Sequence, residues 1–159
     1  MDNLFSSAVL FRNTRFMFIG EYHHAIDEKG RIAVPVKFRK QLENGAVVTK
    51  GLDECLLLYP MKEWEVEAAK IAKLSIAKAD SRAFNRHMLS GAMDIDMDKQ
   101  GRVIIPDYLR KFAGIGKKAV VTGLYDKIEI WDAEKWEQYK KVTESESNAI
   151  AERMGELGI

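Results

Sequence analysis

The chain has 159 residues, of which 47% are hydrophobic and 31% charged, and its formal net charge is +1. This size allows one good hydrophobic core or two small interlocked ones, as in an ordinary soluble globular protein. No apolar stretch approaches the roughly 18 residues that suggest a membrane span. The single cysteine, Cys55, excludes a disulfide within the chain, and its apolar run to Tyr59 predicts a buried thiol in a reducing compartment.

The net charge becomes informative when it is divided along the chain. Residues 27–50 carry six Lys/Arg against three Asp/Glu, and residues 98–127 carry seven against three. The segments 51–97 and 128–159 are acidic, with six against eight and four against eight. The two basic segments are therefore candidates for meeting a polyanion, although scattered solvated charge is an equally open interpretation.

The first 16 residues match nothing later in the chain and lack the apolar core of a signal peptide. We interpret residues 1–16 as a disordered extension or as the result of a start site placed too far upstream. Residues 17–26 are typical of a strand that enters a turn at Asp27–Gly30, where glycine supplies a positive φ. A strand at 31–34, a short helix from Pro35 to Leu42, and strands at 46–49 and 56–59 are expected to follow.

Residues 62–90 form the longest helical pattern, with Trp64, Ala68 and Ile71 at helical spacing. Asp80 is a candidate N-cap for a second helical piece within this segment. We interpret the whole segment as a packing and spacing element.

The turn sequence then occurs a second time. Asp-x-x-Gly-Arg, three apolar residues and Pro stand at 27–35 and again at 98–106, 71 residues later. The likeness runs on to Lys40 and Lys111, and after a one-residue gain four more positions match at an offset of 72. They are Gly51-Leu52, Tyr59 and Trp64, facing Gly123-Leu124, Trp131 and Trp136. The chain therefore is a tandem duplication.

The second unit is expected to repeat the elements of the first. These are strands at 93–97 and 102–105, a helix at 106–113 ended by Gly114, and strands at 118–122 and 127–131. A final helix from about Ala133 is expected to fray toward the C-terminus. The predicted organisation is a first repeat at 17–64, a helical connector at 65–92, a second repeat at 93–139 and a C-terminal helix or tail at 140–159.

With both turns in register, and with the opening Met17-Phe18-Ile19-Gly20-Glu21-Tyr22, the chain resembles the MraZ family of bacterial proteins, related to AbrB-type swapped-hairpin DNA-binding domains. The resemblance implies an α+β, β-rich fold in which two repeats interlock as one pseudo-twofold β-barrel with peripheral helices. It also implies a ring-shaped homo-oligomer that binds short direct repeats in double-stranded DNA. The implied function is regulation of the division and cell-wall gene cluster that includes its own gene.

The turn residues are the candidate site. An arginine fork can bind a phosphate or span guanine O6 and N7, whereas lysine acts more as a point charge. Arg31 and Arg102 are therefore candidate DNA-contacting residues, and Lys29 and Lys99 are expected to neutralise the phosphate backbone of the DNA. Asp27, Gly30, Asp98 and Gly101 are assigned to shaping the turns and orienting the arginines. The alternative is that each Asp–Arg pair only holds its turn, and we interpret Arg39 and Arg110 as solvated charges on an outer helix face.

Other chemistry has little support, and we predict no enzyme, cofactor or metal site. Asp94, Asp96 and Asp98 alternate along one strand, but Lys99 and Ile105 stand where an EF-hand loop needs Gly and Glu. His23 and His24 are expected on opposite strand faces, which disfavours a shared metal. The stretch 114–119 fits a loose G-x-G-x-x-A pattern but follows a helix, the reverse of a dinucleotide site. Trp64, Trp131 and Trp136 are assigned to the core or to subunit contacts.

The favoured function is a cytoplasmic, nucleoid-associated DNA-binding regulator, with no membrane or small-molecule partner. The alternative is an oligomeric scaffold whose basic faces bind an acidic protein. A hydrolase that uses Asp94, Asp96 and Asp98 is the third possibility. Salt dependence cannot separate the first two functions, because both are electrostatic. Preference for one DNA sequence over another can separate them.

Overall fold

The computed structural model describes residues 17–158, and the expectations for residues 1–16 lie outside this range. In the first repeat, the strands are β1 (Phe18–Ala25), β2 (Arg31–Ala33), β3 (Ala46–Lys50) and β4 (Leu56–Pro60). A 3₁₀ turn (Val36–Phe38) and α2 (Arg39–Leu42) lie between β2 and β3. In the second repeat, the matching elements are β5 (Met93–Ile95), β6 (Arg102–Ile104), α5 (Asp107–Ala113), β7 (Lys118–Tyr125) and β8 (Lys127–Asp132).

The strand order shows how the two repeats interlock. Six strands form one antiparallel sheet in the order β1-β7-β8-β4-β3-β5. Exchanging each strand for its counterpart in the other repeat reverses this order and leaves it otherwise unchanged. The first strand of each repeat therefore pairs with the other repeat, β1 with β7 and β5 with β3. The predicted α+β pseudo-twofold swapped arrangement is confirmed.

Within the described residues, the predicted β-barrel is not closed. The sheet ends at β1 and β5, and β2 and β6 form a separate two-stranded sheet. The reason lies in the turn that follows β1: after a single bridge between Ile26 and Ile32, the chain leaves β1 and pairs with β6 instead. This ribbon packs Ile32 and Val103 into the same core as the large sheet, so it covers the core without continuing the ladder.

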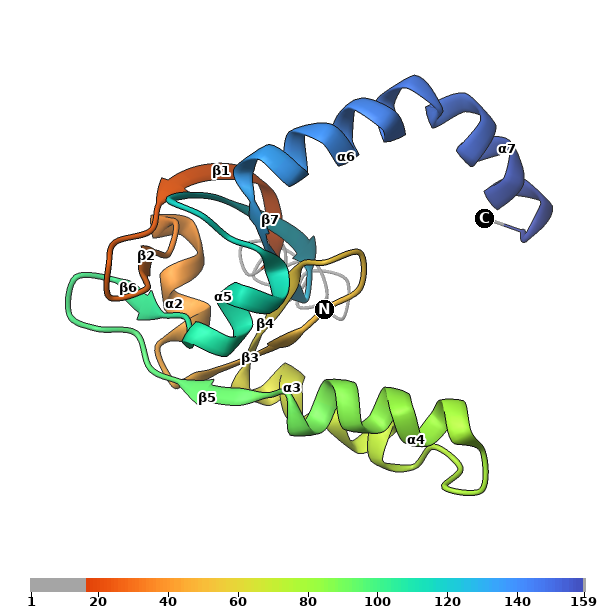
Figure 1. The fold of residues 1–159 in the computed structure, drawn as a ribbon, viewed down its shortest axis with the longest axis horizontal. Coiled ribbons are helices and arrows are strands. Elements are labelled where there is room, and N and C mark those ends of the chain that lie inside the picture. The colour runs from red at the N-terminus through yellow and green to blue at the C-terminus, as the bar shows by residue number, and fades with distance from the viewer. Residues whose placement is uncertain (1–16, 159) are drawn as a thin grey trace, which may run out of the picture.

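Two helical arms leave the body on the side away from β2 and β6 (Figure 1). The first arm consists of α3 (Met61–Ala72), α4 (Ala79–Asn85) and a π-helix (Arg86–Ser90), which together return the chain to β5. The second consists of α6 (Ala133–Ser145) and α7 (Ser147–Glu156). Within residues 17–158, no helix combines the length and the apolar character needed to cross a membrane. The arms leave the two turns at the opposite end of the molecule uncovered.

The tryptophans belong to the core or pack against it, which is one of the two predicted places: Trp131 is in β8, and Trp64 and Trp136 lie on the arms. Trp131 is 3% exposed, and its ring centroid lies 5.4 Å from that of Trp136 on α6. Trp64 on α3 packs 5.5 Å from Tyr59. Cys55 is fully buried beside Trp131, which confirms the prediction of a buried thiol.

Several local predictions need correction. Pro35 and Pro106 are helix N-caps with extended ψ values of 136° and 145°, rather than first helical residues, so the extended backbone continues two residues beyond β2 and β6 before the helices begin. Asp80 lies inside the first turn of α4, where Lys78 occupies the N-cap without a side-chain bond. The C-terminal tail contains a second helix, because α7 begins after a break at Glu146 and runs from Ser147 to Glu156.

The strand ladders also refine the register of the duplication. Thr49 pairs with Leu57 in the first repeat, and Thr122 pairs with Glu129 in the second. Thr122 is therefore the counterpart of Thr49, 73 residues apart, while β4 and β8 keep the offset of 72. Two residues are therefore added in the loop that precedes β7, where insertions are tolerated, and one is missing from the turn between β7 and β8.

Candidate nucleic-acid interface

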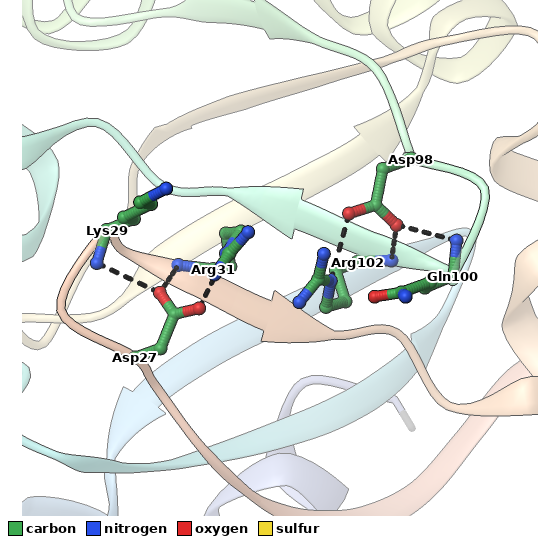
Figure 2. A network of polar contacts seen from close by, with 6 residues as sticks. All are labelled: Asp27, Lys29, Arg31, Asp98, Gln100 and Arg102. Atoms are coloured by element: carbon green, nitrogen blue, oxygen red, sulfur yellow. Dashed lines mark hydrogen bonds and ion pairs between the residues drawn. The ribbon is translucent and has the colours of Figure 1, made fainter.

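Each Asp-x-x-Gly-Arg turn is closed by its aspartate. In the first turn, Asp27 Oδ1 accepts the amide N–H of Lys29 at 3.0 Å and that of Arg31 at 2.9 Å (Figure 2). The backbone closes it further, with Gly30 N–H donating to the Asp27 carbonyl at 3.0 Å. An aspartate side chain that accepts amides two and four residues ahead fixes a reversal that would otherwise leave those donors unpaired.

The second turn repeats this geometry. Asp98 Oδ1 accepts the amides of Gln100 and Arg102, both at 2.9 Å, and Gly101 N–H donates to the Asp98 carbonyl at 3.0 Å. Gly30 and Gly101 have φ values of +81° and +78°, the left-handed region that glycine enters without steric cost. The prediction that glycine supplies a positive φ in the turn is confirmed.

The same aspartates orient the arginine side chains. Asp27 Oδ2 accepts Nε–H of Arg31 at 2.5 Å, and Asp98 Oδ2 accepts Nε–H of Arg102 at 2.9 Å. Both pairs therefore use Nε. Within residues 17–158, no hydrogen bond or ion pair engages the terminal amino groups of either arginine, which leaves that edge of each guanidinium available for a ligand.

The aspartates remain ionised at neutral pH. Hydrogen bonds from the backbone N–H of Arg31, and then from its guanidinium, hold the pKa of Asp27 below its usual range. The backbone and side chain of Arg102 act in the same way on the pKa of Asp98. Because hydrogen bonds to the charged form favour it, each turn keeps its carboxylate charged and its arginine aligned under physiological conditions.

The strands after the turns bring the two arginines onto one surface. In the β2–β6 ribbon, Arg31 pairs with Ile104, and Ala33 pairs with Arg102. Side chains alternate along a strand, so these four residues share one face while Ile32 and Val103 face the core. Arg31 and Arg102 thus stand diagonally across one outward face, each contributed by a different repeat (Figure 2).

This face also carries apolar side chains that the sequence interpretation missed. Ile104 is 54% exposed and lies opposite Arg31 on the neighbouring strand. Ala33 occupies the matching position in the first repeat, opposite Arg102. The period-2 alternation of Arg102-Val103-Ile104 is the signal that could have placed Ile104 beside Arg102. The face is therefore cationic at two diagonal corners and apolar at the other two.

Lys29 and Lys99 are exposed residues of the two turns. They do not occupy matching positions, because Lys99 corresponds to Glu28, and Lys29 to Gln100. The lysine charges are thus placed differently in the two repeats, while the arginines are placed alike. A polyanion would therefore meet the lysine charges at different positions in the two repeats but the arginines at equivalent positions.

The interpretation of Arg39 and Arg110 as solvated charges is wrong. Nε–H of Arg39 donates to the Val34 carbonyl at 2.9 Å, and Nε–H of Arg110 donates to the Ile105 carbonyl at 3.0 Å. Both side chains fold back over the strand-to-helix junction instead of extending into solvent. No periodic signal reveals this, because the helices that carry them are too short to define a face.

A group of possible metal ligands exists elsewhere. Glu21, His23 and Glu137 bring ligand atoms within 4.8 Å of one another on the exposed side of β1 and α6. Lys140 Nζ lies 3.0 Å from Glu21 Oε1 and 3.5 Å from Glu137 Oε1, and the bond to Glu21 raises the pKa of Lys140. An ammonium ion therefore already neutralises this group. Both carboxylate oxygens of Asp98, which the sequence offered as a possible metal ligand, already accept hydrogen bonds within its turn.

Comparison with known proteins agrees with this geometry. A family model described as "MraZ protein, putative antitoxin-like" matches the chain twice, at residues 17–87 and 88–157. The chain belongs to the MraZ family. Each match to the MraZ model contains one Asp-x-x-Gly-Arg turn, so the tandem duplication inferred from the motif is confirmed.

Many curated MraZ relatives align over most of the chain. A "Transcriptional regulator MraZ" of Clostridium tetani is 50% identical, and those of Herpetosiphon aurantiacus and Natranaerobius thermophilus are 48% and 46% identical. Each alignment spans 143 residues, which is 90% of this chain and the full length of the relative. Relatives in this family are thus named for transcriptional regulation.

Proposed function

We propose that the protein is a sequence-specific DNA-binding transcriptional regulator that presents the β2–β6 ribbon to the major groove. The single observation that carries this proposal is the diagonal placement of Arg31 and Arg102 on one outward face. A two-stranded ribbon fits the major groove, and guanidinium groups there can span guanine O6 and N7. The names of the relatives support the same class of function.

The turn geometry supports a division of roles. Asp27 and Asp98 hold Nε of the arginines, so the terminal amino groups point outward as a fixed fork. A fork whose orientation is already fixed loses less rotamer entropy on binding than a free side chain. Arg31 and Arg102 would therefore contact bases or phosphates, and Lys29 and Lys99 would add charge. Ile104 would supply an apolar contact, as to a thymine methyl group.

The proposed target and assembly follow from the family resemblance. We place the binding sites at short direct repeats near the promoter of the division and cell-wall cluster that includes the protein's own gene. A cytoplasmic, nucleoid-associated ring of identical subunits would engage several repeats at once. Weak contacts from single ribbons would then sum through their effective concentration.

The experiment compares a duplex from upstream of the protein's own gene with a scrambled duplex, by fluorescence anisotropy across a salt series. Arg31→Ala and Arg102→Ala are expected to remove the preference for the upstream duplex at unchanged oligomer mass. Arg153→Ala, on the distant helix α7, is the matched control and is expected to bind as wild type. The slope of log K against log salt should become shallower by about 0.9 for each phosphate that a variant no longer neutralises.

Equal binding of both duplexes by the wild type would contradict this function. The basic ribbon would then be a general anionic surface, and a scaffold that binds an acidic protein would account for it better. Normal DNA preference in both arginine variants would instead confine the Asp–Arg pairs to holding the turns.

A further inference from the structure

Each turn glycine lies against an arginine of the other repeat. A Cβ added at Gly30 would lie 2.9 Å from both Nε and Cζ of Arg110. A Cβ added at Gly101 would meet the guanidinium of Arg39 at under 3.0 Å. The arginines of the two short helices are therefore packed on the turns of the opposite repeat, and glycine is the residue that leaves room for them.

The backbone joins the same groups. Ile105 N–H donates to the Gly30 carbonyl at 2.9 Å, while the Ile105 carbonyl accepts Nε–H of Arg110. In the other half, Val34 N–H donates to the Gly101 carbonyl at 2.8 Å, and the Val34 carbonyl accepts from Arg39. One residue of each repeat thus ties an arginine of its own repeat to a glycine of the other. This link lies immediately before Arg31 or Arg102.

We propose that Arg110 positions the turn that carries Arg31, and that Arg39 positions the turn that carries Arg102. Each repeat therefore orients the DNA-contacting arginine of the other repeat, and neither turn is complete without both. This role rests on the proposed DNA-binding function, although the contacts themselves do not. Arg39 and Arg110 are positioning residues, because they act through the turn glycines.

We call the contact of Arg110 with the first turn, and that of Arg39 with the second turn, a brace. The two braces are not equal. Arg110 Nη2 lies 3.6 Å from Asp107 Oδ1, three residues earlier on α5. The position that corresponds to Asp107 in the first repeat is Val36, which is 75% exposed and offers no charge. The arginine that braces the first turn is thus held by a carboxylate of its own repeat. The Arg31 turn is expected to be the more rigid of the two.

Arg110→Lys and Arg39→Lys test the brace directly. Lysine keeps the positive charge but lacks the Nε–H donor and the flat guanidinium that packs on glycine. Amide hydrogen exchange of the full-length oligomer, followed by mass spectrometry, is read for residues 28–31 and 99–102. Arg110→Lys should speed exchange at 28–31 about fivefold, the ratio for one net hydrogen bond, and leave 99–102 unchanged. Arg39→Lys should do the reverse.

A matched control, and a variant designed to strengthen the weaker brace, accompany this pair. Arg153→Lys makes the same chemical change on an exposed part of α7 and should alter neither turn. Val36→Asp places a carboxylate three residues before Arg39, as Asp107 stands before Arg110, and should slow exchange at 99–102. Faster exchange of both turns alike, or of the turn in the same repeat as the altered arginine, would overturn the proposal.

DNA binding then tests what the brace does. Arg110→Lys should weaken binding to the upstream duplex about fivefold and leave the salt slope unchanged, since the same phosphates stay neutralised. Combined with Arg31→Ala it should cost nothing more, whereas combined with Arg102→Ala it should cost the same fivefold again. Equal effects in both combinations would overturn the crosswise role. Crosswise exchange together with equal binding of the two duplexes by the wild type would support the brace and refute the proposed function.

Discussion

Replacing either turn glycine by alanine should destabilise the fold by several kcal/mol. Gly30 and Gly101 have φ near +80°, where a Cβ costs about 1–2 kcal/mol. At Gly30 that Cβ would also lie 2.9 Å from the Ile105 carbonyl oxygen and from the Arg110 guanidinium. Moving both neighbours adds about 1–2 kcal/mol of strain and weakened hydrogen bonding. The expected loss for Gly30→Ala is therefore about 2–4 kcal/mol, and Gly101→Ala should behave alike.

The assay is urea denaturation at one fixed protomer concentration, followed by tryptophan fluorescence and far-UV circular dichroism. Gly155→Ala is the matched control, because it lies in α7 with nothing within 4 Å of its added Cβ. Alanine is the better helix former, so this variant should unfold as wild type or be up to about 1 kcal/mol more stable. A change below about 0.5 kcal/mol for both turn variants would refute the reasoning, since that is the range of ordinary surface substitutions.

Two further predictions follow from the pKa shifts. Because the pKa values of Asp27 and Asp98 are lowered on folding, the unfolded chain binds more protons, and the turns lose stability as pH falls below about 4 through the folded pKa values. Urea midpoints of wild type and of the Asp27→Asn, Asp98→Asn double variant should therefore differ at pH 7 and converge in acid; a constant gap would contradict this. Burial, together with the nearby Glu129 carboxylate, raises the pKa of the Cys55 thiol, so native protein should resist thiol reagents that modify it rapidly in urea. Rapid modification of the folded protein would show that Cys55 is accessible.

The resemblance and the repeat pattern anticipated the interlocked fold but not how far its ladder extends. Two units of β-branched runs, turns and short helices preceded by proline were readable because strand and turn preferences act within a few residues. The predicted barrel is not closed, because β2 leaves β1 after one bridge and pairs with β6. That choice depends on a partner 71 residues away, which no local pattern encodes.

The candidate site divides in the same way. The sequence by itself determined each turn, because the Asp27 side chain bonds only to residues two and four positions ahead, and the Asp98 side chain does the same. Only the tertiary structure decided that Arg31 and Arg102 share one face, and that Arg39 and Arg110 support the opposite turns. The turns are made of contacts inside five consecutive residues, whereas the shared face and the braces are made between repeats. Contacts between repeats exist only once the strands have been exchanged.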